Sequence, residues 1–439
     1  MKRIRRFGKA SAAVLLSSMM VLSACGGGDS APAASGNSGS SGDGGSKKVQ
    51  LQMWFWQGAS FEKIIPEFNR THPNIEIVPQ IYKWEDAHKK LLTAMSAGSG
   101  APDIAMVDIS QLDQFTKYPD KFYDLNEFGA KDLAKDYLEW KWKQSMAGDK
   151  QLGLPTDIGP MVLYYRQDLF QQAGLPSEPD DVAAKIKTWD DFLAAGKVLK
   201  EKTGADILSN PTELYNAVRD QGDELYFDKD NNLIIDKNPQ VKKALDYFKK
   251  SREMGIAGTY DQKNALQEYS AALNSGKIAT YISAAWGRGH VETRAPDTKG
   301  KWRAAKIPEG TGNMGGSFLM IPKQGKLSKE AYEAISWLTS PAQQLEIFKI
   351  SGNFPSTPSV YGDKAFTETG YDFWGGQKLG VLYSEVAKAV KVQRKGPDYA
   401  TVDTIIGDGL QAVAVDKNKD AEKEFWALVE KAKAKLKNK

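Results

Sequence analysis

Hydrophobic and polar residues follow strand and helix periods in turn along the stretch 49–108. Strands are predicted for residues 49–56, 75–78 and 102–107, and amphipathic helices for 61–72 and 84–97. Alternation of this kind predicts a parallel sheet with helices on both faces. Ligands of such sheets collect beyond the carboxyl ends of the strands, and three polar or aromatic residues follow two of these ends: Trp56, Gln57 and Asp108.

A second block of alternating elements begins near residue 152. Strands are predicted for 161–165 and 277–283, with a turn at 228–232 between short strands at 225–227 and 233–235. Helices are predicted for 167–173, 189–203, 241–254, 261–275 and 328–350, with Pro341 as a helix start inside the last range, and for most of the C-terminal part. Thr188 is expected to cap the helix at 189–203, whose first turn carries Asp190 and Asp191.

The N-terminal apolar run at 10–22 differs from the other apolar stretches because five basic residues and no acidic residue precede it. As a helix it spans only about 20 Å, whereas a bilayer core is about 30 Å thick. We therefore expect residues 1–24 to be a signal peptide. The run ends in Leu-Ser-Ala-Cys at 22–25, which resembles the lipobox of bacterial lipoproteins. That resemblance implies cleavage before Cys25 and attachment of lipid to its thiol; the alternative is an ordinary signal peptide with an incidental cysteine.

Residues 26–46 are almost entirely Gly, Ser, Ala, Asn and Asp, a composition that forms a flexible coil rather than a core. With Cys25 they are expected to form a tether, residues 25–46. No later apolar stretch approaches the length of a spanning helix, so the lipid is the only membrane contact that the sequence predicts. The protein is therefore expected on the extracytoplasmic face of a cell membrane.

Charge and cysteine content restrict the function further. Cys25 is the only cysteine, so no disulfide within the chain is expected. The whole chain has 59 basic and 55 acidic residues, but residues 1–24 hold five of the basic ones, which leaves 54 against 55. A near-neutral remainder gives no electrostatic reason for nucleic-acid binding. The long chain after the tether is expected to form more than one domain.

Several motifs occur in the order found in sugar-type extracellular solute-binding proteins, the receptors of ABC importers, and the chain resembles that family over essentially all of its length after the tether. The most specific stretch is 151–175 (QLGLPTDIGPMVLYYRQDLFQQAGL), supported by 97–104 (AGSGAPDI), 188–192 (TWDDF), 274–279 (NSGKIA) and 315–318 (GGSF). The pattern WGRG at 286–289, KGKWR at 299–303 and IP at 307–308 is most similar to receptors for oligosaccharides such as arabinose oligomers.

The resemblance implies an α/β fold of the two-lobed periplasmic-binding-protein type II class, with strands that cross between the lobes. Lobe one is expected to hold residues 49–154 plus 309–352, and lobe two residues 155–308 plus 353–439. The resemblance also implies a monomer that binds a carbohydrate between the lobes and docks on the transmembrane subunits of an ABC permease. A lipid anchor on such a receptor favours a Gram-positive cell.

Sugars present flat C–H faces to aromatic rings, and hydroxyls to carboxylates, amides and Arg donors. All 11 Trp residues lie beyond residue 50, although most are expected in the core. By resemblance Trp286 stacks on a sugar ring, with Gly287 and Gly289 leaving its face open, and Asp157 contacts the ligand. The remaining candidates are Trp56, Gln57, Asp108, Gly316, Ser317, Trp374, Glu85 and Arg394.

Ordinary structural roles are open for most of these candidates: a buried anchor under a loop for Trp286, a helix cap for Asp108, a turn for Asp157, a strand entry for Gly316 and Ser317, and surface packing for Trp374. Trp54 is expected to pack rather than to bind.

Enzymatic and structural functions find less support in the sequence. Three histidines at unrelated spacings argue against a zinc site, and neither a nucleophile elbow nor a phosphate loop is present. Asp228 begins a calcium-loop pattern, but Leu233 stands at the position that requires Gly, so a hairpin turn is favoured. We expect no metal, no cofactor and no enzymatic activity. An extracellular glycoside hydrolase is the main alternative, and an anchored adhesin has no repeats to support it.

Overall fold

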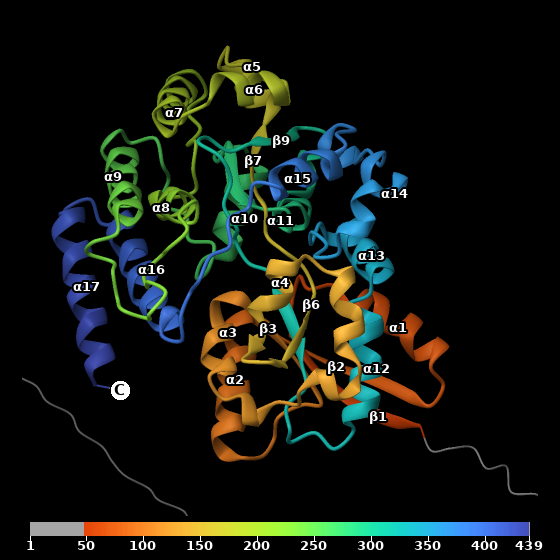
Figure 1. The fold of residues 1–439 in the computed structure, drawn as a ribbon. Coiled ribbons are helices and arrows are strands. Elements are labelled where there is room, and N and C mark those ends of the chain that lie inside the picture. The colour runs from red at the N-terminus through yellow and green to blue at the C-terminus, as the bar shows by residue number, and fades with distance from the viewer. Residues whose placement is uncertain (1–47, 439) are drawn as a thin grey trace, which may run out of the picture. The chain divides into compact units, whose positions relative to one another are not determined.

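The computed structural model describes residues 48–438 (Figure 1). The predicted signal peptide, the lipidated Cys25 and the tether therefore lie outside the described residues. Two sheets organise the described part, and we name each sheet with its helices lobe one and lobe two. This arrangement is the two-lobed α/β fold that the sequence predicts.

Lobe one is built on a five-stranded sheet in the order β2-β1-β3-β10-β6. Its strands are β1 (Val49–Trp56), β2 (Ile75–Tyr82), β3 (Ile104–Asp108), β6 (Gly153–Pro155) and β10 (Ser317–Met320). As predicted, β1 runs parallel to β2 and to β3. Strand β10 is antiparallel to both β3 and β6, so the complete sheet is mixed. In Figure 1 the cyan β10 lies among strands that come from the first 155 residues of the chain.

Helices cover both faces of this sheet. They are α1 (Phe61–Thr71), α2 (Trp84–Ala97), α3 (Ile109–Thr116), α4 (Glu139–Gln144) and α12 (Ser328–Leu338), with 3-10 turns at Pro119–Lys121, Leu125–Phe128 and Ala130–Asp136 and a small hairpin of β4 (Met146–Ala147) and β5 (Lys150–Gln151). Leu51, Met53 and Phe55 of β1 pack in one core with α1 and α12. Ala105 and Val107 of β3 pack in another core, which includes residues of α2 and α3.

Lobe two contains an antiparallel sheet in the order β8-β7-β9, from β7 (Met161–Arg166), β8 (Thr280–Ala284) and β9 (Trp302–Lys306). All six residues of β7 are buried, and its side chains alternate between two cores. Leu163 and Tyr165 belong to the larger core, whereas Val162 and Tyr164 belong to the core that includes Trp374. The continuous apolar run of β7 thus reflects burial on both faces.

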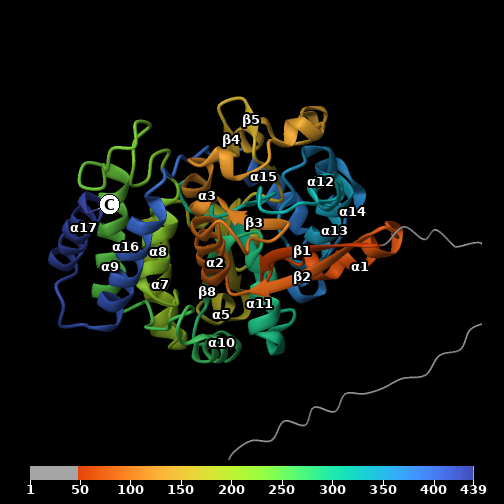
Figure 2. The ribbon, with the colours of Figure 1, turned by 90° about the horizontal axis from the view of Figure 1, so that it is seen from below.

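The helices of lobe two come from the middle and the end of the chain. They are α5 (Gln167–Gln172), α6 (Pro179–Lys185), α7 (Trp189–Thr203), α8 (Pro211–Arg219), α9 (Pro239–Glu253), α10 (Leu266–Asn274), α11 (Gly287–Arg294), α14 (Lys364–Thr367), α15 (Leu379–Ala387), α16 (Tyr399–Val415) and α17 (Ala421–Lys437), with 3-10 turns at Pro296–Thr298, Pro358–Gly362 and Asp372–Trp374. Helix α13 (Pro341–Ser351) contacts both α1 and α11. Figure 2 shows α9, α16 and α17 side by side at one end of lobe two.

Local capping signals placed several helices correctly. Thr188 caps α7, and the capping box is completed by Asp191. Pro341 is the first residue of α13, which separates it from α12 within the predicted helical range 328–350. Pro and Thr at these positions act locally, so the sequence was sufficient to find them.

Two predictions of secondary structure were wrong. The segments 225–227 and 233–235 are not strands, because only one bridge, between Phe227 and Leu233, joins them. Two segments of three residues are too short to form a stable sheet by themselves. The turn between them is present as expected, because the Asp228 carboxylate accepts from the N–H groups of Asp230 and Asn232. The helix predicted from residue 261 begins only at Leu266, because the Asp261 side chain accepts two backbone N–H bonds and holds a turn there.

Within residues 48–438, no helix is both long and apolar enough to cross a bilayer.

A partly buried carboxylate in α8 gives a pH-dependent prediction. Glu213 accepts from Ser209 and from the backbone N–H of Ile282 in β8, at 2.6 and 2.7 Å, and burial raises its pKa to about 7. The native state therefore binds a proton that the unfolded chain, with a Glu pKa of about 4.3, has already lost. The free energy of unfolding contributed by Glu213 thus falls by up to about 3 kcal/mol as the pH rises from about 4.5 to about 7.

Glu213→Gln removes this titration but keeps one acceptor oxygen. We expect the stability of the variant relative to the wild type to increase as the pH rises from about 4.5 to about 7 and to stay level above that, measured by urea unfolding at several pH values. Other titrating groups cancel in the difference between the two proteins. A difference that stays constant over this pH range would contradict the prediction.

Candidate functional site

The polar residues predicted at the ends of separate strands lie in one row along an edge of the lobe-one sheet. Ser317, the first residue of β10, pairs with Asp108, the last residue of β3. Phe318 pairs with Pro155 at the end of β6, and the backbone N–H of Thr156 donates to the Ser317 carbonyl at 2.9 Å. Asp157 follows directly. We call Asp108, Asp157, Gly316 and Ser317 the rim.

Asp157 ties the chain that leaves β6 to the chain that enters β10. Its Oδ1 accepts from the backbone N–H of Ser317 at 2.9 Å and from the Thr156 hydroxyl at 2.6 Å. The residue is only 6 % exposed, and burial raises its pKa. Asp157 is therefore a buried acceptor at the crossing between the lobes, not a residue of an exposed turn.

Asp108 caps helix α3, which is the structural role left open for it. Its Oδ1 accepts from both the N–H and the hydroxyl of Ser110, at 2.8 and 2.5 Å. The backbone N–H of Asp108 donates to Nε2 of His88, whose Nδ1 donates to the Trp84 carbonyl at 2.8 Å. Burial lowers the pKa of His88, consistent with a neutral ring in this position. The half-buried Asp108 is thus fixed in direction by its neighbours.

Trp56 and Gln57 mark the same edge at the end of β1. The half-buried Trp56 ring lies against His88, with ring centroids 5.1 Å apart. Gln57 is exposed, and its backbone N–H donates to the Tyr82 carbonyl. Trp54, two residues earlier, packs edge-on against Tyr82. Of the two Trp residues of β1, Trp56 is the one nearer the rim.

Trp286 reaches the rim from lobe two. It follows β8 at the start of α11, and its Nε1 donates to the Met314 carbonyl at 3.1 Å. A Cβ added to Gly315 would lie 3.3 Å from the same Nε1, so the half-buried indole contacts the segment that leads into β10. The rim carboxylates and this aromatic ring therefore converge from two lobes.

The two glycines beside Trp286 lie close to other segments. A Cβ on Gly287 would lie 2.7 Å from Ser283, and one on Gly289 would lie 2.8 Å from the Ser351 carbonyl. These glycines permit close packing of α11, and that they leave the face of Trp286 open stays a prediction.

Two other candidates stand apart from the rim. Trp374 is fully buried in the core of lobe two, where its Nε1 donates to Glu292 and its ring contacts Tyr164. The position is neither a plate for a sugar nor surface packing, the alternative left open for Trp374, because the ring is part of a core and has no exposed face. Arg394 is exposed and donates to Asn231 at 2.9 Å.

Glu85 takes part in one of several contacts between the lobes. Its Oε1 lies 3.8 Å from Nζ of Lys263, which also pairs with Asp408 of α16 at 3.1 Å. In a second contact, Asp113 of α3 accepts from the backbone N–H of Gly396 at 2.6 Å. The lobes are thus in direct contact through α2 and α3 of lobe one.

The sequence analysis missed a buried lysine beside the rim. Lys141 of α4 is fully buried, and its Nζ lies 3.9 Å from the centroid of the Phe318 ring. Burial lowers its pKa to about 7, although the nearby Asp157 and Asp108 oppose that shift. No local signal in the sequence marked it, because its burial depends on contacts with Phe318 and Gly316 from a distant part of the chain.

Metal binding finds no support in the described residues. Between residues 48 and 438, no group of three or more His, Asp or Glu side chains is placed to hold an ion.

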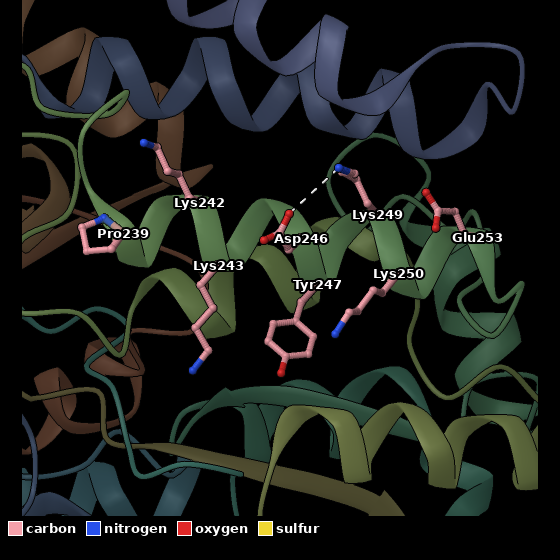
Figure 3. A pocket seen from close by; sticks show the side chains of 8 residues that line it. All are labelled: Pro239, Lys242, Lys243, Asp246, Tyr247, Lys249, Lys250 and Glu253. Atoms are coloured by element: carbon pink, nitrogen blue, oxygen red, sulfur yellow. Dashed lines mark ion pairs between the residues drawn. The ribbon is translucent and has the colours of Figure 1, made fainter.

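A pocket on α9 lies elsewhere on lobe two and shares no residue with the rim (Figure 3). Three of its lysines are paired with carboxylates: Lys250 with Asp190 at 2.8 Å, Lys249 with Glu422 at 2.6 Å, and Lys243 with Glu309. The pocket is a solvated face of paired charges, so we place the candidate site at the rim and Trp286.

Comparison with known proteins identifies the family of the chain. The family described as bacterial extracellular solute-binding protein matches residues 57–345. The chain is 26 % identical to the arabinooligosaccharide-binding protein of Bacillus subtilis (strain 168) over 90 % of this chain and 94 % of the relative. It is also 26 % identical to the protein of the same name from Halalkalibacterium halodurans, over 76 % and 78 % of the two chains.

A solved structure of an extracellular solute-binding protein family 1 member superimposes with a TM-score of 0.78 at 28 % identity, covering 88 % of this chain and 99 % of that one. The match to the family model extends over more than half of the chain, from the end of β1 into α13. The chain therefore belongs to the bacterial extracellular solute-binding proteins, a family of binding proteins rather than enzymes, and has their two-lobed fold.

Proposed function

We propose that this protein is the receptor of an ABC importer and captures an oligosaccharide between its two lobes. The observation that carries the proposal is the convergence of Asp108 of lobe one, Asp157 at the crossing between the lobes and the Trp286 ring of lobe two. An aromatic ring and oriented carboxylates are the groups that sugars require. The names of the two arabinooligosaccharide-binding relatives support a ligand of this class.

The proposed ligand-binding residues are those at or next to the rim: Trp56, Gln57, Asp108, Asp157, Trp286, Gly316 and Ser317. Glu85 is proposed to act through the contact with Lys263 between the lobes. The positions of Trp374 and Arg394 do not support a role for either residue in ligand binding. We propose the lobe boundaries as in the sequence analysis, with residues 49–154 plus 309–352 in lobe one and 155–308 plus 353–439 in lobe two.

Binding is proposed to shift the population between open and closed arrangements of the lobes. A sugar that touches both the rim and Trp286 favours the closed arrangement through contacts absent from the open one. The bonds between Asp113 and Gly396, and between Asn353 and the Gly58 carbonyl, join the lobes in the structure and are expected to break on opening.

The remaining proposals concern location and partners. We propose cleavage of the signal peptide after residue 24, lipidation of Cys25, and a tether that holds a monomer on the outer face of a Gram-positive cell membrane. An anchored receptor keeps a high local concentration near its permease. The closed form is proposed to dock on the transmembrane subunits of that permease.

Incubation of the full-length protein with a panel of oligosaccharides tests the proposal. The panel contains arabino-oligosaccharides of increasing length, with lactose and maltose for comparison. We expect a saturable rise in Tm with at least one member of the panel and no cleavage products by chromatography. Cleavage products would instead indicate the hydrolase, and the absence of binding to every sugar would contradict the proposed function.

A further inference from the structure

Lys141 is a buried cation without a hydrogen-bond acceptor. Its Nζ has no partner within residues 48–438, although the side chain is 0 % exposed. A buried ammonium in this state is costly, because it has lost its hydration and gained no acceptor in exchange. The nearest aromatic contact is the face of Phe318, which offers only partial compensation.

The amine occupies the position that a side chain at residue 316 would take. A Cβ on Gly316 would lie 2.8 Å from Nζ of Lys141 and 2.7 Å from the Asp157 carbonyl. Gly316 also has a φ of +99°, a conformation that other residues rarely adopt. Gly316 therefore leaves the space that the Lys141 amine occupies. This role explains why a glycine is needed at residue 316, which a backbone contact to ligand would not.

Charged groups from three other segments face the amine. They are Asp157 after β6, Asp108 at the end of β3, and the buried Lys395 before α16. Both carboxylates bond to other groups, Asp157 to Ser317 and Thr156, and Asp108 to Ser110. In the described chain no carboxylate forms an ion pair with Lys141, so Asp157 and Asp108 attract the ammonium without providing its acceptor, and Lys395 repels it.

We propose that Lys141 is a ligand-binding residue beside the rim, and that its ammonium donates a hydrogen bond to an oxygen of the bound carbohydrate. This inference rests on the proposed function. An ammonium donor beside the Asp108 carboxylate suits adjacent sugar hydroxyls, of which one accepts and one donates. Lys141 thereby selects ligands that present an acceptor oxygen at the rim between Asp108 and Asp157.

The proposal predicts a coupling between binding and protonation. Burial holds the pKa of Lys141 at about 7 in the free protein, and a bond from the ammonium to the ligand raises it. Binding above about pH 7 therefore takes up a proton, and affinity falls as the pH rises from about 6.5 to about 9. Lys395 also has a pKa lowered by burial, so its contribution has to be separated.

The test compares the wild type with Lys141→Met, an apolar side chain of similar length, and with Lys395→Met as the matched control. Affinity and proton uptake are measured by titration calorimetry in buffers of different ionisation enthalpy, using the panel sugar that the wild type binds best. For Lys141→Met we expect affinity to fall about tenfold or more, proton uptake to vanish, and Tm to equal or exceed that of the wild type. Lys395→Met is expected to retain the proton uptake.

The outcomes are distinguishable. An unchanged affinity and proton uptake in Lys141→Met, with sugar binding intact in the wild type, would overturn the role of Lys141 and leave the proposed function standing. Proton uptake that disappears in Lys395→Met but not in Lys141→Met would also overturn it. A wild type that binds no sugar would overturn both proposals together.

Discussion

Replacement of Trp286 by Ala is expected to weaken oligosaccharide binding by about tenfold or more. The indole is the aromatic group that lobe two contributes beside the rim, where it contacts residues 314 and 315. Because the ring is only half-buried, its removal and the loss of its hydrogen bond are expected to lower the free energy of unfolding by only about 1–2 kcal/mol. The effect on binding therefore exceeds the effect on folding.

Titration with the best panel sugar measures the first effect, and thermal unfolding measures the second. Trp426→Ala is the matched control, since Trp426 is also half-buried but packs against Phe425 in α17. Trp286→Phe keeps an aromatic face without the N–H donor and is expected to retain part of the affinity. A Trp286→Ala protein with wild-type affinity would refute the assignment of this ring to the ligand.

Replacement of Trp374 by Ala is expected to have the opposite signature, a large loss of stability. The ring is fully buried among Tyr164, Trp302 and Phe373, and its Nε1 bonds to Glu292 at 2.7 Å. Removal of a large buried aromatic side chain costs about 3–5 kcal/mol, through lost burial and the cavity left behind. For a folded part of this size we expect a fall in Tm of about 5 °C.

Thermal and urea unfolding measure this effect, and sugar titration well below the transition serves as the second readout. We expect affinity close to that of the wild type there, because the ring lies in a core and presents no face to the rim. Wild-type stability combined with weakened binding would show that Trp374 contacts ligand after all.

Much of the lobe-one sheet was predictable because its signals are local. The alternation from residue 49 to Asp108 predicts three parallel strands and two helices, and the rule for strand ends points to Trp56 and Asp108 from the pattern alone. Caps such as Thr188 and Pro341 were equally accessible, since their hydrogen-bonding and steric effects extend over only a few residues.

Long-range pairing was harder to predict. Strand β10 returns to lobe one from more than 200 residues later in the chain and pairs with β3 in the antiparallel direction. Propensity and periodicity describe a segment and say nothing about its distant partner. The prediction of strands at 225–227 and 233–235 was wrong for a related reason, because a segment with a strand pattern forms a sheet only when other strands lie beside it.

The sequence alone determined the order of elements, the two-lobed class through its motifs, and the residue types that a sugar site needs. Only the tertiary structure separated Trp286 from Trp374, since both are Trp in Gly-containing loops and differ in which side chains surround them. It also revealed Lys141, which is buried and lacks a hydrogen-bond acceptor because of the way β10, the chain after β6 and α4 pack together. Burial and unmet hydrogen bonds arise from contacts between distant segments, so no local pattern could specify them.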